Sequence, residues 1–188
     1  MRLFTIQSKK AFEALMDNGI LRIDEALLPN TMAKKYPFIF EEPYAYMREE
    51  MEKRIGAPPA SVLYPIWAWY KYRGLRSPSK EKLFAEYGEG VLLTLEAEPS
   101  AVLLSDFNLY DSYLLHSLPI LDDKEMEAYL ESADGLNRDK AFASYREGWE
   151  RIFVPQYDKR VLAAKSYVQA TLWQIKREDV LSFEVFGG

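Results

Sequence analysis

The residues best suited to hold a ligand lie between Tyr64 and Arg73, in the segment YPIWAWYKYR. If this segment is a strand, Trp67 and Trp69 share one face, because successive side chains of a strand point to opposite faces. An indole pair beside Lys71 and Arg73 can stack a nucleobase or a nicotinamide while a cation holds a phosphate nearby. The alternative is that both tryptophans fill the core and the cations are simply solvated.

The chain that follows is basic, although the whole sequence carries a net charge of −5. Between positions 71 and 82 only one acid, Glu81, accompanies five basic residues: Lys71, Arg73, Arg76, Lys80 and Lys82. We therefore expect Arg73 or Arg76 to hold the phosphate of a ligand, since guanidinium and phosphate form paired, charge-assisted hydrogen bonds. The acidic balance of the whole chain argues against a protein that coats DNA or RNA, and leaves only a local basic surface for such a partner.

A second pair of polar side chains lies near the start of the chain, in RLFTIQ. On a strand, Thr5 and Gln7 share a face and Ile6 points away from them. Their hydroxyl and amide groups could read an amide or a ribose hydroxyl by paired donor and acceptor contacts. The alternative is an edge strand whose polar face lies in water.

Scarce cysteine and histidine narrow the chemistry. The chain has no cysteine, and His116 is its one histidine, which excludes thiol nucleophiles, zinc ribbons and multi-histidine metal sites. His116 lies among leucines and is expected to pack, and the acids between 122 and 127 are expected to begin a helix, so no metal is predicted. Any catalysis would depend on other groups, and Glu150 and Glu96 are the weak candidate acids.

The elements that must position these residues can be outlined from periodicity and capping residues. Ser8 and Gly19 stand where a helix would begin and end, and a second helix is expected from near Pro43 to Gly56. Further helices are expected within 108–160, among them one that carries Trp149 and Phe153. Strands are expected at residues 2–7, 61–72 with an interruption or edge at Pro65, 91–99, 167–175 and 180–186. Residues 101–107 are expected to form either a short strand or a corner.

This order predicts one α+β domain over residues 1–188, with a split antiparallel or mixed sheet, flanking helices, and the two terminal strands in a common sheet system. A chain of 188 residues with 48% apolar content can bury a sizeable core without disulfides. The first residues lack the apolar run of a signal peptide, and no stretch is long and apolar enough for a membrane helix. We therefore expect a soluble, cytoplasmic protein with no membrane partner.

Several spaced motifs resemble one known family. They are LFTIQ, NGIL at the end of the first helix, YPIWAWY, VLLTLEAE followed by VLLSDF, WERIF and QATLWQI. Together they resemble the bacterial family DUF3841 over nearly the whole chain. The name of that family implies no function.

The layout of the expected elements is more distantly similar to small ADP-ribosyltransferase-like proteins, above all the toxins that modify DNA bases and the tRNA 2′-phosphotransferases. In the toxins a histidine-x-threonine pattern on the first strand contacts NAD and a late strand carries a glutamate. The resemblance would put Thr5 and Gln7 at the first-strand places, and Thr171 or Gln169 where the glutamate is expected. Thr171 offers no carboxylate, so transfer would require another acid such as Glu150 or Glu96.

The sequence thus leaves two functional hypotheses open. The first is an ADP-ribosyltransferase-like cleft that binds NAD or another nucleotide, with degenerate catalytic residues; its ligand-binding residues would be Thr5, Gln7, Trp67, Trp69, Arg73, Arg76, Gln169 and Thr171. The second is a non-enzymatic module that binds a protein or nucleic-acid partner through the aromatic and basic surface from Trp67 to Lys82. A further possibility is that the rings are core and the protein is structural or regulatory.

Overall fold

The computed structural model describes residues 1–23, 37–62, 64–76, 80–114, 149–153 and 167–187, and these form helices and an antiparallel sheet, as expected for the α+β class. The strands are β1 (Arg2–Gln7), β2 (Ile20–Leu21), β3 (Ile66–Lys71), β4 (Gly90–Glu96), β5 (Leu103–Asp106), β6 (Val168–Leu172), β7 (Ile175–Lys176) and β8 (Val180–Phe186). The helices are α1 (Lys9–Asn18), α3 (Pro37–Ile55), α4 (Lys80–Tyr87) and α5 (Phe107–Leu114), with 3-10 turns at η1 (Pro99–Ala101), η2 (Trp149–Phe153) and η5 (Arg177–Asp179).

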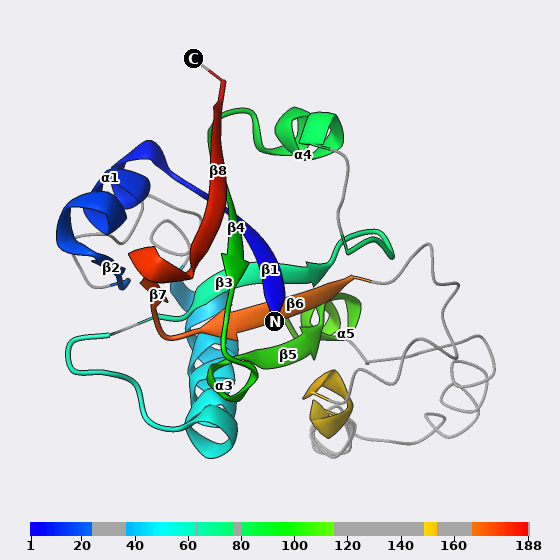
Figure 1. Ribbon diagram of the computed structural model, residues 1–188. Helices are drawn as coiled ribbons and strands as arrows, with labels where there is room; N and C mark the ends of the chain where they lie inside the picture. Colours follow the sequence, from blue (N-terminus) through cyan, green and yellow to red (C-terminus); the bar gives the residue numbers. More distant parts are fainter. Residues whose placement is uncertain (24–36, 63, 77–79, 115–148, 154–166, 188) are drawn as a thin grey trace, which may run out of the picture.

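Six strands form the central sheet in the order β5-β6-β3-β1-β4-β8, and every neighbouring pair is antiparallel. The first strand is therefore central, with β3 on one side and β4 on the other, while β8 lies at an edge (Figure 1). The expectation that both terminal strands share a sheet is confirmed. β2 and β7 pair separately.

The first helix shows how local chemistry sets its length. The side chain of Ser8 accepts a hydrogen bond from the backbone N–H of Ala11, and Gly19 ends the helix with a φ of 75°. The N–H of Gly19 donates to the carbonyl of Leu15, which satisfies one of the last turn's free acceptors. Both caps confirm the sequence prediction.

Each face of the sheet carries its own core. On the first face α1 packs against Leu3, Leu93 and their neighbours. The second face carries two clusters. One joins α3, α5 and η2 to Leu103 and Trp173, with Trp67 packed against it; the other joins Leu83 of α4 to a set of rings and aliphatic side chains that includes Phe4, Trp69, Tyr72, Leu92 and Phe186.

The edge strand β8 leaves an apolar stripe exposed. Leu181, Phe183 and Val185 alternate along it and are 52%, 55% and 53% exposed. Their alternation puts all three on the first face, where the ring of Phe183 lies 4.7 Å from that of Phe12 on α1.

Two helix predictions need correction. α3 starts at Pro37 and includes Pro43, where the sequence predicted the start; the missing amide hydrogen of Pro43 costs this helix one hydrogen bond without ending it. Residues 149–153 form a 3-10 turn, not the end of an α-helix.

The rest of the expected helical region, including His116 and the acids between 122 and 127, lies outside the described residues. Within the part of the chain that is described, every helix is too short or too polar to cross a membrane.

Candidate functional site

A tight hairpin just after β3 sets the directions of Arg73 and Arg76. Tyr72 and Leu75 exchange two backbone hydrogen bonds, of 2.9 and 3.0 Å, around Arg73 and Gly74. Both central residues have positive φ, 51° and 76°, as in the type I′ turns of two-residue hairpins. This backbone is strained at Arg73, which has a Cβ, and relaxed at Gly74. The reversal puts Arg73 and Arg76 in different pockets.

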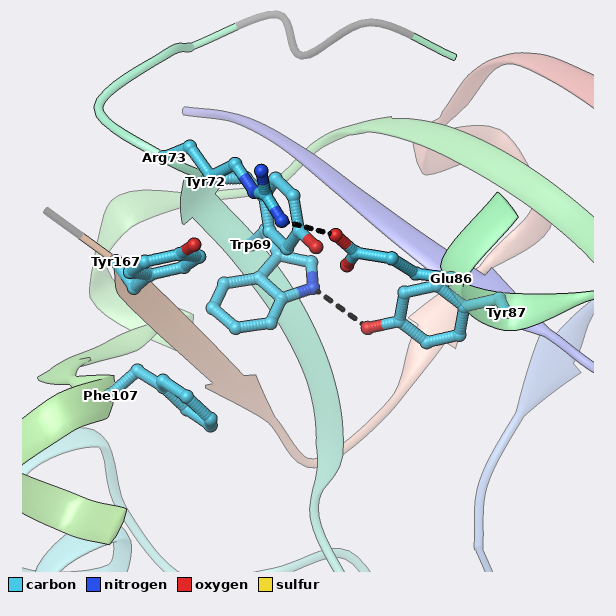
Figure 2. A pocket seen from close by; sticks show the side chains of 7 residues that line it. All are labelled: Trp69, Tyr72, Arg73, Glu86, Tyr87, Phe107 and Tyr167. Atoms are coloured by element: carbon cyan, nitrogen blue, oxygen red, sulfur yellow. Dashed lines mark hydrogen bonds and ion pairs between the residues drawn. The ribbon is translucent and has the colours of Figure 1, made fainter. Parts of the chain in front are cut away.

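Arg73 lies at a pocket on the second face of the sheet, which we call the aromatic pocket. It encloses about 360 Å³, within the range of small-molecule sites. Figure 2 shows Phe107 and Tyr167 on one side of the Trp69 indole and Glu86 and Tyr87 on the other. The residues that line it are Trp69, Tyr72, Arg73, Glu86, Tyr87, Phe107 and Tyr167.

The rings of the aromatic pocket hold one another at steep angles. The indole of Trp69 lies 5.0 Å from the ring of Tyr72 and 5.4 Å from that of Phe107, at interplanar angles of 77° and 65°. Tyr72 meets Tyr167 at 5.3 Å and 84°. Edge-to-face pairs of this kind are favourable beyond their buried area, so the walls of the pocket are preformed.

Two polar contacts cross the mouth of the aromatic pocket. The Nη2 of Arg73 donates to a carboxylate oxygen of Glu86 at 2.6 Å, and the indole N–H of Trp69 donates to the hydroxyl of Tyr87 at 3.2 Å. Burial raises the pKa of Tyr87, and nearby Glu86 adds to the rise, while the bond from Trp69 opposes it. The phenol is therefore neutral at physiological pH.

The structure brings four of the predicted ligand residues to this face of the sheet. Trp67 lies opposite Thr171 and Trp69 opposite Gln169 in the pairing of β3 with β6. Only Trp69 of these four lines the aromatic pocket. The hydroxyl of Thr171 is buried and donates to the carbonyl of Leu103 at 3.3 Å.

Trp67 packs in the α3/α5 cluster, and the buried Oε1 of Gln169 has no hydrogen-bond partner. Trp67, Gln169 and Thr171 thus lie on the same face of the sheet as the aromatic pocket but do not line it.

Thr5 and Gln7 lie on the opposite face from the tryptophans. Thr5 is opposite Leu93, a member of the first-face core, and alternation places Gln7 on the same side. The hydroxyl of Thr5 donates to the carbonyl of Trp67 at 2.7 Å and accepts from the amide of Gln7 at 2.8 Å. The expected single cleft of Thr5, Gln7 and the two tryptophans is therefore not formed, because the sheet separates the two pairs.

The candidate acids lie away from the aromatic pocket. Glu96 is 54% exposed and accepts a hydrogen bond from the backbone amine of Met1 at 2.6 Å. Glu150 is 70% exposed and pairs with Arg54, also at 2.6 Å. Glu86 is the only carboxylate among the lining residues that the structure describes, and it is already bound to Arg73.

Sequence reasoning missed four residues of the aromatic pocket. Glu86 and Tyr87 end α4, and Phe107 and Tyr167 flank β5 and β6, where the N–H of Phe107 donates to the carbonyl of Tyr167 at 3.0 Å. Only the pairing of β5 with β6 joins this last pair, and strand pairing at such sequence separation leaves no local signal. A glutamate next to a tyrosine at a helix end is too common a pattern to single out.

Within the described part of the chain, the lining offers aromatic faces, one cation and one carboxylate, and includes no serine, histidine or unpaired acid. Aromatic faces and a cation suit the binding of a planar, negatively charged ligand. Among the residues the structure describes, no cluster of three or more metal-ligating side chains occurs.

Comparisons with known proteins place the chain by family. No curated protein and no solved structure was found that matches it. A model of the sequence family described as "Domain of unknown function (DUF3841)" matches residues 2–181, which is nearly the whole chain. The chain therefore belongs to the DUF3841 family.

Proposed function

We propose that the chain binds a nucleotide-like ligand in the aromatic pocket, with a planar base against the aromatic walls and a phosphate at Arg73. The observation that carries the proposal is the set of five rings around about 360 Å³ with an arginine at the mouth. Aromatic rings stack on the face of any base, and a guanidinium binds phosphate through paired hydrogen bonds. NAD, which combines two planar bases with a pyrophosphate, is the first ligand to test.

The Arg73–Glu86 pair would have to open for a phosphate to bind. Their side chains are 48% and 38% exposed, so solvent screens the pair and its net contribution is small, about 0–1 kcal/mol. Opening the pair therefore costs little, and a phosphate can take the place of Glu86 at Arg73. Glu86 would then repel the phosphate, which favours ligands whose charge lies on the Arg73 side of the mouth.

We propose binding without group transfer. An ADP-ribosyl transfer of the usual kind relies on a free carboxylate near the reacting sugar, and Glu86 is the one acid among the described residues of the lining. Glu96 and Glu150 are paired elsewhere. The part of the ADP-ribosyltransferase-like hypothesis that we retain is thus the nucleotide ligand.

Titration calorimetry and thermal melts with NAD, ADP-ribose and AMP test the proposal. Trp69 is only 9% exposed and its truncation would damage the core, whereas Tyr87 is 45% exposed and suits mutation better. We expect a nucleotide to raise the Tm, and Arg73→Gln and Tyr87→Ala each to weaken binding about tenfold, the loss of one charged hydrogen bond or one stacked ring.

Arg177→Gln, on the distant η5 turn, is the matched control and should bind as the wild type does. If no nucleotide binds at millimolar concentration to the folded chain, or if both pocket variants bind as tightly as the control, the proposal is wrong.

A further inference from the structure

A second hollow lies by the other end of α4, and we call it the basic pocket. It encloses about 130 Å³. Its apolar lining includes Phe4, Leu83 and Leu92, and its cations are Arg2, Arg76 and Lys80. These three cations come from β1, from the chain after the hairpin, and from the first residue of α4, so the fold itself gathers them.

Two of the three cations have no carboxylate partner. Among the described residues, no acid lies within ion-pair distance of Arg2 or Arg76, while Lys80 pairs with Glu184. In a chain with an excess of acids, two neighbouring arginines that no described carboxylate pairs directly leave positive charge available to a ligand.

Arg76 is fixed in position without being neutralised. Its Nη2 donates to the backbone carbonyl of Arg2 at 3.2 Å, and its guanidinium carbon lies 3.4 Å from the centroid of the Tyr70 ring. The stack and the single bond hold the plane of the guanidinium and leave its other N–H groups to donate elsewhere. Binding of an anion here costs little side-chain entropy, because the side chain of Arg76 is already ordered.

The surroundings of Arg76 lower the pKa of its guanidinium. Burial lowers the pKa of Arg76, and the charge of Arg2 lowers it further, against the opposing pull of Glu96. Glu96 is bound to the amine of Met1, and its own pKa is lowered chiefly by that bond, with Arg2 and Arg76 adding at longer range. One shared carboxylate thus faces three cationic groups.

We propose that the basic pocket binds a phosphate group, held by the guanidinium groups of Arg2 and Arg76 with Lys80 at its side. Two arginines suit the tetrahedral, multiply charged oxygens of phosphate better than a single carboxylate, which one guanidinium would satisfy. The small volume fits the phosphate itself and leaves any larger part of the ligand outside. This site is independent of the nucleotide proposed for the aromatic pocket, since no described residue lines both pockets.

Calorimetric titration of the full chain with inorganic phosphate and with pyrophosphate, at constant ionic strength maintained with chloride, tests the site. The test variant is Arg2→Gln/Arg76→Gln, and the charge-matched control is Lys176→Gln/Arg177→Gln at the η5 turn. We expect pyrophosphate to bind the wild type and the control equally and to bind the test variant at least about tenfold more weakly. Arg76→Lys, which keeps the charge and loses the paired donors, should fall between them.

Each other outcome contradicts the proposal. Equal weakening in the test and control variants means a diffuse charge effect, and no binding to folded wild type means no site. Loss of pyrophosphate binding in Arg73→Gln, with Arg2→Gln/Arg76→Gln unaffected, moves the phosphate to the aromatic pocket. That result would overturn this proposal and support the proposed function, so the two can fail separately. Circular dichroism and the Tm of each unliganded variant show that it is folded.

Discussion

The indole N–H of Trp69 donates a hydrogen bond to the hydroxyl of Tyr87, and this contact ties the central strand β3 to the last turn of α4. Trp69 is nearly buried, whereas Tyr87 is 45% exposed. The bond therefore joins a ring of the core to a ring at the mouth of the aromatic pocket. This hydrogen bond therefore helps to hold that wall in position, beside the Arg73–Glu86 pair and the buried Leu83 of α4.

Tyr87→Phe keeps the ring and removes the acceptor. We expect the free energy of unfolding to fall by about 1 kcal/mol, because the indole N–H of the nearly buried Trp69 loses its hydrogen-bond partner. Urea denaturation followed by tryptophan fluorescence measures it. A variant as stable as the wild type would show that water replaces the hydroxyl.

Thr5→Val should destabilise the fold without touching the aromatic pocket. The substitution removes the bond to the Trp67 carbonyl and the acceptor for Gln7, and we expect a loss of about 1–2 kcal/mol. Thr5→Ser, which keeps the hydroxyl, should lose less. Nucleotide affinity, measured by calorimetry, should not change in either variant; a weaker affinity in Thr5→Val alone would return Thr5 to the ligand site.

Glu50 should make stability fall in acid. Burial works to raise its pKa, but hydrogen bonds from Lys53 and Arg54 at 2.8 and 3.0 Å outweigh it and lower the pKa. Because the folded-state pKa is the lower one, the stabilisation is present at neutral pH and is lost as the pH falls through it. Glu50→Gln should therefore cost about 1 kcal/mol at pH 7 and progressively less in acid. Equal losses in urea melts at pH 7 and at pH 3 would contradict this assignment.

Asp106 should show the opposite dependence. It is buried before α5 and accepts a hydrogen bond from the N–H of Leu109 at 2.9 Å, yet burial outweighs its backbone bonds and raises its pKa. Its charge therefore weakens the fold as the pH rises between the unfolded and folded pKa values. Asp106→Asn keeps the cap and should be neutral or stabilising at pH 7, whereas Asp106→Ala should cost about 1 kcal/mol. Thermal melts across the acid range compare the two, and an Asn variant less stable than the Ala variant would be decisive against this account.

Gly90→Ala should be more damaging than Gly19→Ala. Both glycines have positive φ, but a Cβ at Gly90 would lie 2.9 Å from the Gln7 carbonyl oxygen and 3.0 Å from Ile6, whereas a Cβ at Gly19 meets nothing within 4 Å. Gly19→Ala should cost about 1–2 kcal/mol, the strain of the left-handed backbone alone. Gly90→Ala should cost more, because β1 must also shift. Similar midpoints for the two variants in denaturant would show that β1 yields freely.

Much of the local structure follows from local chemistry. Ser8 and Gly19 correctly predicted the two ends of α1. The alternation of side chains along a strand correctly predicted that Trp67 and Trp69 share a face. These features depend on residues within a few positions of one another, so a sequence pattern carries them. Pro43 misled for the same reason, since its local effect is to begin or break helices and only packing shows that this helix includes it.

The site could not be predicted because its parts meet through the order of the strands. Because β1 lies between β3 and β4 with Phe4 opposite Trp69, these two side chains share one face of the sheet and Thr5 lies on the other face. A face can be predicted for each strand alone, but how the faces of two strands match depends on register. Tyr167 lies beside Tyr72 for the same reason, although about half of the chain separates them in sequence.

The exposed apolar stripe on β8 favours association between molecules of this protein. Sheet edges in natural proteins are usually blunted by charges, prolines or bulges. Along VLSFEVF the single charge is Glu184, which Lys80 neutralises, so little repulsion opposes edge-to-edge stacking between molecules. Salting-out anions, which strengthen apolar association, should therefore precipitate this protein at low anion concentration, and Phe183→Lys should raise its solubility limit.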